Sequence, residues 1–420
     1  MKKILFAISM MALLLCACSE DEQVPKDKVT DEDFYPIENT LKFEAKELVF
    51  TPQKTSGSIH INTNIEYIVE LEGENKDWIK YDANSNKYIS FEVRPNNSEN
   101  ERSAKCIISN KELKLSDTLL IKQSINKERL ALISIYKALN GDQWVNNENW
   151  CSDKPLNEWE GVMAKGDVEV YRLWISHDAY AKGEIPDCIG DLTSLENISF
   201  EYSNIGGRLP KTIGNLTKLK RLTISNCRFE GEIPESINNC TQFEYVDMSN
   251  NHFTGEIPKS FFQCDQLSYL MLHNNNFTKF TIEKNPISEN LHSLFIEENE
   301  IQSPIPEKLF QCRGLRFFHA ENNRIRGSIP NSIKDALNLE VVYLQNNNID
   351  GQLPSGISND SRLGNIDVRN NQISGTIPDC YSSMTRLIMF DVRDNYLDIE
   401  NSNSIKNNPN YKDWHLTPQK

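Results

Sequence analysis

Hydrophobic positions recur every 24 residues through the second half of the chain. They stand in pairs two residues apart, as in Leu270 and Leu272 or Val342 and Leu344. A spacing of two places both side chains on one face of a short β-strand. A further apolar column, which includes Leu267, lies in the stretch that precedes each pair. One coil cannot bury these side chains alone, so the fixed period predicts a solenoid of stacked coils.

A polar column follows each hydrophobic pair. Its asparagines are expected to point into the coil, where the amide can satisfy backbone groups of its own and of the adjacent coil. Leaving such a buried group unpaired costs about 1–3 kcal/mol. In most coils a Gly-x-(Ile/Leu)-Pro turn comes four residues later, because glycine allows positive φ and proline fixes φ near −65°. The structural asparagine column consists of Asn251, Asn275, Asn299, Asn323, Asn347, Asn371 and Asn395.

The combined pattern, Leu-x-Leu-x-x-Asn-x-(Leu/Phe/Ile)-x-Gly-x-Ile-Pro, resembles the plant-type class of leucine-rich repeats. Plant receptor-kinase ectodomains and polygalacturonase-inhibiting proteins carry this class. The resemblance implies a right-handed solenoid with a parallel concave β-sheet. It also implies a helical N-terminal cap at 126–170, repeats at 171–398 and a C-terminal cap at 399–420. The family's N-terminal cap usually holds a cysteine pair, whereas this chain has Cys151 but Met163 near the partner position.

Residues 39–125 have a different pattern, with short apolar segments separated by polar turn residues. This pattern predicts a β-sandwich. The segments Asp77-Trp78-Ile79 and Asn96 through Arg102-Ser103-Ala104 resemble the immunoglobulin-like BACON modules. That family was named for suspected carbohydrate binding and is also proposed to act as a spacer. We expect Trp78 to be a core residue and find no exposed aromatic platform, which favours the spacer role over glycan binding.

The N-terminus begins with Lys2-Lys3 and an apolar run, which are typical of a secretory signal peptide at 1–17. The sequence Leu15-Cys16-Ala17-Cys18 resembles the bacterial lipobox, which implies cleavage before Cys18 and attachment of a lipid to it. An unlipidated signal peptide is the alternative. Residues 18–38 are predicted to be an acidic tether, in which Glu20-Asp21-Glu22 resembles the export tag of Bacteroidetes surface lipoproteins. The expected location is therefore the outer membrane, facing the cell exterior. The alternative for the acidic tether is a solvated spacer without an export role.

Charge and motifs argue against several classes of function. The net charge is −15 and no Lys/Arg-rich run occurs, which excludes nucleic-acid binding. Neither Cys-x-x-Cys nor His-x-x-x-His spacing is found, so we expect no metal or cofactor. The chain also lacks a phosphate loop and a nucleophile elbow, and we expect a monomer without enzymatic activity.

The cysteines are expected to fill space in the core, and their pattern does not indicate a metal or catalytic site. Cys240, Cys264 and Cys312 share one column of the repeat and are expected to be small buried residues. An exported protein can form disulfides. The pairs Cys240–Cys264 and Cys151–Cys188 therefore stay open as alternatives.

Side chains that alternate with the buried strand residues are predicted to face the concave surface. In the middle coils they are aromatic, with acidic residues on one side and arginines beyond. An apolar patch with a charged rim is typical of an interaction surface, although aromatic residues are also favoured in strands. The predicted partner-binding residues are Tyr245, Tyr269, His273, Phe295, Glu297, Phe317, His319, Glu321, Tyr343, Arg369 and Arg393.

One coil departs from the repeat. It has Lys279, Phe280 and Ile282 where glycine and proline belong. The departure indicates either a local bend or a second contact point.

These observations lead to three hypotheses of function. The first is a receptor or adhesin that binds a protein or glycan partner on the concave face. The second is an accessory glycan-binding lipoprotein of a polysaccharide-uptake system, suggested by the BACON-like segment. The third is an inhibitor of foreign glycan-degrading enzymes, suggested by the resemblance to the plant inhibitors. The second hypothesis requires residues 39–125 to bind glycan by themselves.

Overall fold

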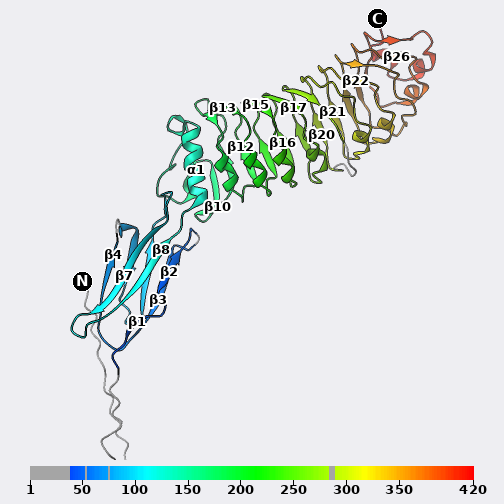
Figure 1. Cartoon of the computed structure of the whole chain (residues 1–420). Coiled ribbons are helices and arrows are strands. Elements are labelled where there is room, and N and C mark those ends of the chain that lie inside the picture. Colours follow the sequence, from blue (N-terminus) through cyan, green and yellow to red (C-terminus); the bar gives the residue numbers. More distant parts are fainter. Residues whose placement is uncertain (1–37, 53, 74–75, 283–288) are drawn as a thin grey trace, which may run out of the picture. The chain divides into compact units, whose positions relative to one another are not determined.

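The computed structural model describes residues 38–420 except 53, 74–75 and 283–288 (Figure 1). Cys18, the signal-peptide prediction and nearly all of the tether therefore lie outside the described residues. The chain divides into two compact units, Met1–Asn126 and Lys127–Lys420, which are treated separately below. Within the described ranges, no helix combines the length and the apolar character needed to cross a membrane.

The first unit contains two four-stranded sheets. Their strand orders are β1-β3-β6-β5 and β2-β8-β7-β4, and every pairing is antiparallel except that of β2 with β8. A 3₁₀ turn, η1 (Lys76–Trp78), precedes β5. The strands are β1 (Leu41–Phe43), β2 (Glu47–Phe50), β3 (Ser56–Thr63), β4 (Ile68–Glu72), β5 (Ile79–Asp82), β6 (Tyr88–Val93), β7 (Arg102–Asn110) and β8 (Leu115–Gln123).

Residues of both sheets share one hydrophobic core. Trp78 belongs to it and is 5% exposed, with the Arg102 guanidinium 4.6 Å from its ring centroid. Tyr81 and Tyr88, by contrast, are 42% and 48% exposed. Tyr81 stands on β5 and Tyr88 on β6 as individually exposed side chains, and the expectation that this unit has no aromatic platform stays a prediction.

The second unit is built on an eleven-stranded sheet. Helix α1 (Lys127–Ala138) precedes it, and β9 pairs with β10 in an antiparallel hairpin. All later neighbours are parallel, as expected for stacked coils. In spatial order the strands are β9 (Val162–Lys165), β10 (Val168–Trp174), β12 (Asn197–Ser199), β14 (Arg221–Thr223), β16 (Tyr245–Asp247), β18 (Tyr269–Met271), β20 (Ser293–Phe295), β21 (Phe317–His319), β23 (Val341–Tyr343), β25 (Asn365–Asp367) and β27 (Met389–Asp391).

The glycine turns form a second set of parallel strands (Figure 1). The turn glycines from Gly207 to Gly375 have φ between 72° and 84°, a region that favours glycine. The strands are β11 (Lys182–Glu184), β13 (Asn204–Gly207), β15 (Arg228–Glu232), β17 (His252–Glu256), β19 (Asn276–Lys279), β22 (Arg326–Gly327), β24 (Asn348–Ile349), β26 (Ser374–Gly375) and β28 (Tyr396–Leu397).

Short 3₁₀ helices close most coils. The turn proline stands directly before the helix, as Pro330 does before η9, because its fixed φ suits the start of a helix. The helices of this unit are η2 (Gly141–Gln143), η3 (Leu156–Glu158), η4 (Asp187–Asp191), η5 (Lys211–Asn215), η6 (Glu235–Asn239), η7 (Lys259–Gln263), η8 (Glu307–Gln311), η9 (Asn331–Asp335), η10 (Asp379–Ser383), η11 (Asn403–Asn407) and η12 (Tyr411–Asp413).

The asparagine column links neighbouring coils by hydrogen bonds. Asn323 donates from Nδ2 to the Ile296 carbonyl of the preceding coil at 2.9 Å and to the Ala320 carbonyl at 3.2 Å. Its Oδ1 accepts the Ile301 N–H of the preceding coil at 2.9 Å. The other asparagines of the column repeat this arrangement. Each amide therefore satisfies backbone groups that the solenoid would otherwise bury unpaired.

The N-terminal cap is held by a buried arginine. Arg129 is fully buried, donates to the Ser152 and Lys154 carbonyls at 2.8 Å each, and forms an ion pair with Asp167. Its guanidinium also lies 5.0 Å from the Trp159 ring centroid. Arg129 therefore joins α1 to the loop and hairpin that begin the sheet.

All eight cysteines among the described residues are free thiols, and most are buried. Both alternatives for a disulfide, Cys240–Cys264 and Cys151–Cys188, are therefore wrong for this structure. The Cys264 thiol instead lies 3.6 Å from the Cys240 carbonyl, where it packs as a small core residue.

Candidate functional site on the open face of the sheet

The eleven-stranded sheet has one face toward the core and one face open. We call the outward side chains of β16 to β27, with the residues two positions beyond each strand, the open face. Three rows run across it, and none of the row members named below belongs to the hydrophobic core. The first row contains Tyr245, Tyr269, Phe317 and Val341; the second Met271, Phe295, His319 and Tyr343; the third His273, Glu297, Glu321, Gln345, Arg369 and Arg393.

The predicted aromatic residues meet across the strands. The ring centroids of Phe295 and His319 are 4.7 Å apart, and those of His319 and Tyr343 are 4.8 Å apart. In the first row, Tyr245 and Tyr269 lie 5.9 Å apart. These side chains are half-buried or exposed, so they form one apolar surface that water can reach.

His292 extends this surface and was missed by the sequence prediction. Its ring lies 5.4 Å from Tyr269 and 5.3 Å from Phe317, so it fills the place where the first row has the buried Ser293. Arg316 Nη1 lies 3.1 Å from its Nε2. The residue stands one position before β20, outside the two-residue alternation, and so carried no signal in the pattern.

Trp174 is a second residue that the prediction missed. It is 47% exposed and stands opposite Ser199 in the pairing of β10 with β12. The two positions are 25 residues apart, so stepping back by 24 from Ser199 reaches the buried Ile175 instead. One extra residue between the two strands therefore puts Trp174, and not Ile175, in line with Ser199.

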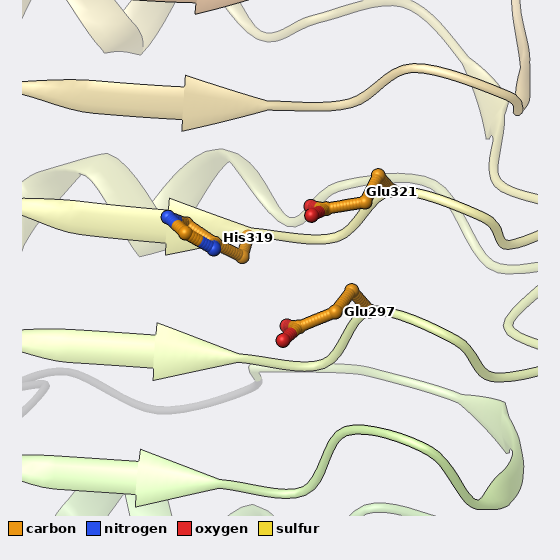
Figure 2. A group of neighbouring side chains, drawn as sticks. All are labelled: Glu297, His319 and Glu321. Carbon is orange, nitrogen blue, oxygen red and sulfur yellow. The ribbon is translucent and has the colours of Figure 1, made fainter.

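An acidic and imidazole cluster lies at the centre of the open face. Glu297, His319 and Glu321 each offer a ligand atom within 4.8 Å of the other two. Figure 2 shows the carboxyl groups of both glutamates reaching along the sheet in the direction of the His319 ring. His273 lies beside the cluster, with Nδ1 3.8 Å from Glu297 Oε1. The sequence predicted no metal site, because these residues form no local motif and come together only through the stacking of coils.

Burial disfavours the charged forms of the two glutamates and of the histidine in this cluster. Burial, together with the negative charges of Glu321 and Glu298, raises the pKa of Glu297 to about 7. Burial likewise raises the pKa of Glu321 and lowers the pKa of His319. One oxygen of each glutamate is buried without a hydrogen-bond partner among the described residues. Each unpaired oxygen costs about 1–3 kcal/mol of folding free energy. The cluster therefore does not contribute to the stability of the fold.

The arginines at the end of the third row are held by buried carboxylates. Arg393 forms hydrogen bonds to Asp391, and Arg369 lies 3.6 Å from both Asp367 and Asp391. Burial opposes ionisation of Asp391, but the hydrogen bonds from Arg393 outweigh it and lower the pKa of Asp391. The two arginines of the predicted charged rim are therefore partly exposed and are paired with carboxylates of the sheet.

The irregular coil places Phe280 in the core and leaves Lys279 exposed. Phe280 is 1% exposed, and its ring lies 5.3 Å from that of Phe262. Lys279 Nζ pairs with Glu256 at 3.0 Å. Residues 283–288 of this coil lie outside the described part of the chain, so the local bend and the second contact point both stay predictions.

The 24-residue repeat and the parallel sheet together identify the second unit as a leucine-rich-repeat solenoid. The Leucine Rich Repeat family model matches residues 218–240, 242–264 and 338–359. No curated protein matches the chain.

Solved structures of plant proteins share this fold. The plant peptide hormone receptor RGFR1, solved in complex with RGF2, is 32% identical over 54% of this chain, with a TM-score of 0.51. The ectodomain of the Arabidopsis thaliana receptor kinase GASSHO1/SCHENGEN3, solved with CASPARIAN STRIP INTEGRITY FACTOR 2, is 25% identical over 64%, with a TM-score of 0.56. The chain covers only 36% and 32% of these two receptors.

A plant ice-binding protein is also similar. It is 25% identical over 65% of this chain and 87% of its own, with a TM-score of 0.52. Receptors and an ice-binding protein thus share one solenoid, so the fold alone does not determine what is bound.

Proposed function

We propose that the chain is a surface receptor or adhesin that binds an extended segment of a protein partner on the open face. The observation that carries this proposal is a pair of runs of ring contacts across neighbouring strands. One run joins Tyr245, Tyr269, His292 and Phe317, and the other joins Phe295, His319 and Tyr343. Aromatic residues supply much of the binding energy at protein interfaces. The similarity to ectodomains of ligand-binding receptors supports the same class of function.

The dimensions of the surface fit a short peptide segment. Five neighbouring strands, β16, β18, β20, β21 and β23, carry the aromatic rows. At about 4.8 Å per strand they span roughly 19 Å, the length of about six extended residues. The partner segment should carry apolar side chains that pack on the rings. The net charge of −15 favours a partner that is not itself acidic.

The proposal includes the cellular context. In it Cys18 carries a lipid that anchors the chain to the outer membrane, facing the cell exterior, and the BACON-like first unit acts as a spacer. The N-terminal sequence supports the anchor. The exposed Tyr81 and Tyr88 favour a second candidate, in which the first unit contributes glycan binding to a polysaccharide-uptake system.

The test compares the intact chain with an open-face variant. The full chain is used to capture a partner from native surface extracts, and the captured molecule is then prepared and its affinity measured. Replacing Phe295, Phe317 and Tyr343 together by alanine should weaken binding at least about 100-fold, because each removes an aromatic anchor. Thermal unfolding should change little, since the three rings pack on the outside of the sheet.

The matched control is Leu337→Ala with Tyr396→Ala. These side chains are 50% and 54% exposed and lie away from the open face, Leu337 after η9 and Tyr396 on β28. The control should bind as the intact chain does. Full affinity in the triple variant would reject the open face as the binding site, and capture of a glycan alone would favour the second candidate.

A further inference from the structure

Two adjacent coils bring three potential metal ligands together. Glu297 and Glu321 occupy the same position of successive coils, two residues beyond β20 and β21, and His319 ends β21. One ligand atom of each lies within 4.8 Å of the others, and the two carboxyl groups extend in the direction of the imidazole (Figure 2). The group is therefore a mixed carboxylate and imidazole cluster and not a simple acidic patch.

The cluster is not neutralised by the protein. Among the described residues, neither Glu297 nor Glu321 forms an ion pair with a lysine or arginine, and Oε2 of each is buried with no hydrogen-bond partner. Nδ1 of the neighbouring His273 is also buried without a partner, and at 3.8 Å from Glu297 it is too distant for a hydrogen bond.

Another carboxylate on the same sheet, Asp391, is neutralised by arginine side chains. Four coils after Glu297, the buried Asp391 receives two hydrogen bonds from Arg393, and Arg369 approaches it as well. Asp391 thus shows how arginine can neutralise a buried carboxylate on this face of the sheet. At Glu297 and Glu321 that compensation is absent from the described structure, and a cation from solution can supply it.

We propose that Glu297, His319 and Glu321 bind a divalent transition-metal ion. One imidazole nitrogen and two carboxylate oxygens are ligands that Zn²⁺ and its first-row neighbours accept, whereas Mg²⁺ and Ca²⁺ prefer oxygen alone. His273 stands beside Glu297 as a further donor. Binding of the ion does not depend on the partner of the proposed function, so the two proposals can fail separately.

The geometry needs only a small adjustment. An ion about 2.1 Å from each ligand atom places those atoms roughly 3–3.5 Å apart. The terminal torsion of a glutamate is soft, so rotation of the two carboxyl groups can close the present separation. Three protein ligands leave coordination positions for water. These positions face the open side of the sheet, since the cluster is half-buried and not enclosed.

The test is metal binding by the full chain, without an affinity tag and stripped with EDTA. Titration with Zn²⁺ and Co²⁺ should show one ion bound per chain at micromolar concentrations. Glu297→Gln, His319→Gln and Glu321→Gln should each weaken binding at least about 100-fold, because each removes a direct ligand. The Co²⁺ absorption spectrum should lack a thiolate charge-transfer band, which excludes binding by the exposed Cys151.

A histidine and glutamate pair elsewhere provides the control. Glu230 and His252 are exposed and stand opposite each other on β15 and β17. Replacing both by glutamine should leave metal affinity unchanged. Circular dichroism of each variant would verify folding. Absence of stoichiometric binding by the intact chain, or full affinity in the folded Glu297 and Glu321 variants, would overturn the proposal.

Discussion

Replacing Arg129 by methionine should destabilise the second unit by about 3 kcal/mol, because removing one partner of a buried ion pair leaves the other without compensation. Asp167 keeps 16% side-chain exposure, so water can recover part of the loss. The carbonyls of Ser152 and Lys154 also lose charged donors at 2.8 Å. Methionine preserves much of the packing volume, so the effect should come from the polar contacts.

Urea or guanidinium unfolding followed by tryptophan fluorescence measures this effect directly. Trp144, Trp150 and Trp159 pack together near Arg129 and report the unfolding of the cap. The exposed Arg313 provides the control, since Arg313→Met should shift stability by no more than about 0.5 kcal/mol. Equal effects of the two substitutions would show that Arg129 does not hold the cap.

Replacing Asn323 by alanine should cost about 2–4 kcal/mol, because the Ile301 N–H and two carbonyls then lose buried partners. Asn323 donates to Ile296 and Ala320 and accepts from Ile301, which joins two coils. Stability in a solenoid depends on contacts between neighbours. The loss should therefore weaken the whole stack and not one coil alone.

Chemical denaturation also tests this prediction, and Asn359→Ala is the control. Asn359 is exposed and outside the column, so its replacement should change stability by no more than about 0.5 kcal/mol. A comparably small effect at Asn323 would mean that water or backbone adjustment satisfies the same groups. The asparagine column would then have no stabilising role.

The solenoid was predictable because its determinants are local and repeated. Each coil has the same hydrophobic pair, asparagine and turn, so Leu270, Leu272 and Asn275 define their place without knowledge of the rest. The first coil breaks this logic. Its single extra residue sets Trp174 opposite Ser199 and puts Ile175 in the core, which a strict period of 24 reverses.

The alternation of inward and outward side chains along each strand predicted only part of the candidate site. Alternation placed Phe295, His319 and Tyr343 on one face, and their rings do meet there. It could not show that Asp367 and Asp391 become buried and hold the arginines, because burial at the end of the sheet depends on the cap that follows. His415 of the cap pairs with Asp391 in an isolated parallel β-bridge. His415 lies outside the repeats, so the repeat pattern could not predict this pairing.

The metal-ligand cluster was missed for a related reason. Glu297 and His319 are 22 residues apart, and no spacing rule for metal motifs includes such a distance. The coil period brings them together from adjacent rows. In a repeat protein, ligand sets should therefore be sought across rows of neighbouring coils as well as along the chain.

Site-specific photo-crosslinking tests most directly whether the open face binds the partner. Benzoylphenylalanine replaces Tyr343 in one chain and the exposed Leu337, which lies off the open face, in another. After incubation with an extract from which the intact chain captures its partner, illumination should join that partner covalently to position 343 and leave position 337 unmodified. Crosslinking of the same partner at position 337 but not at 343 would contradict the proposed binding face.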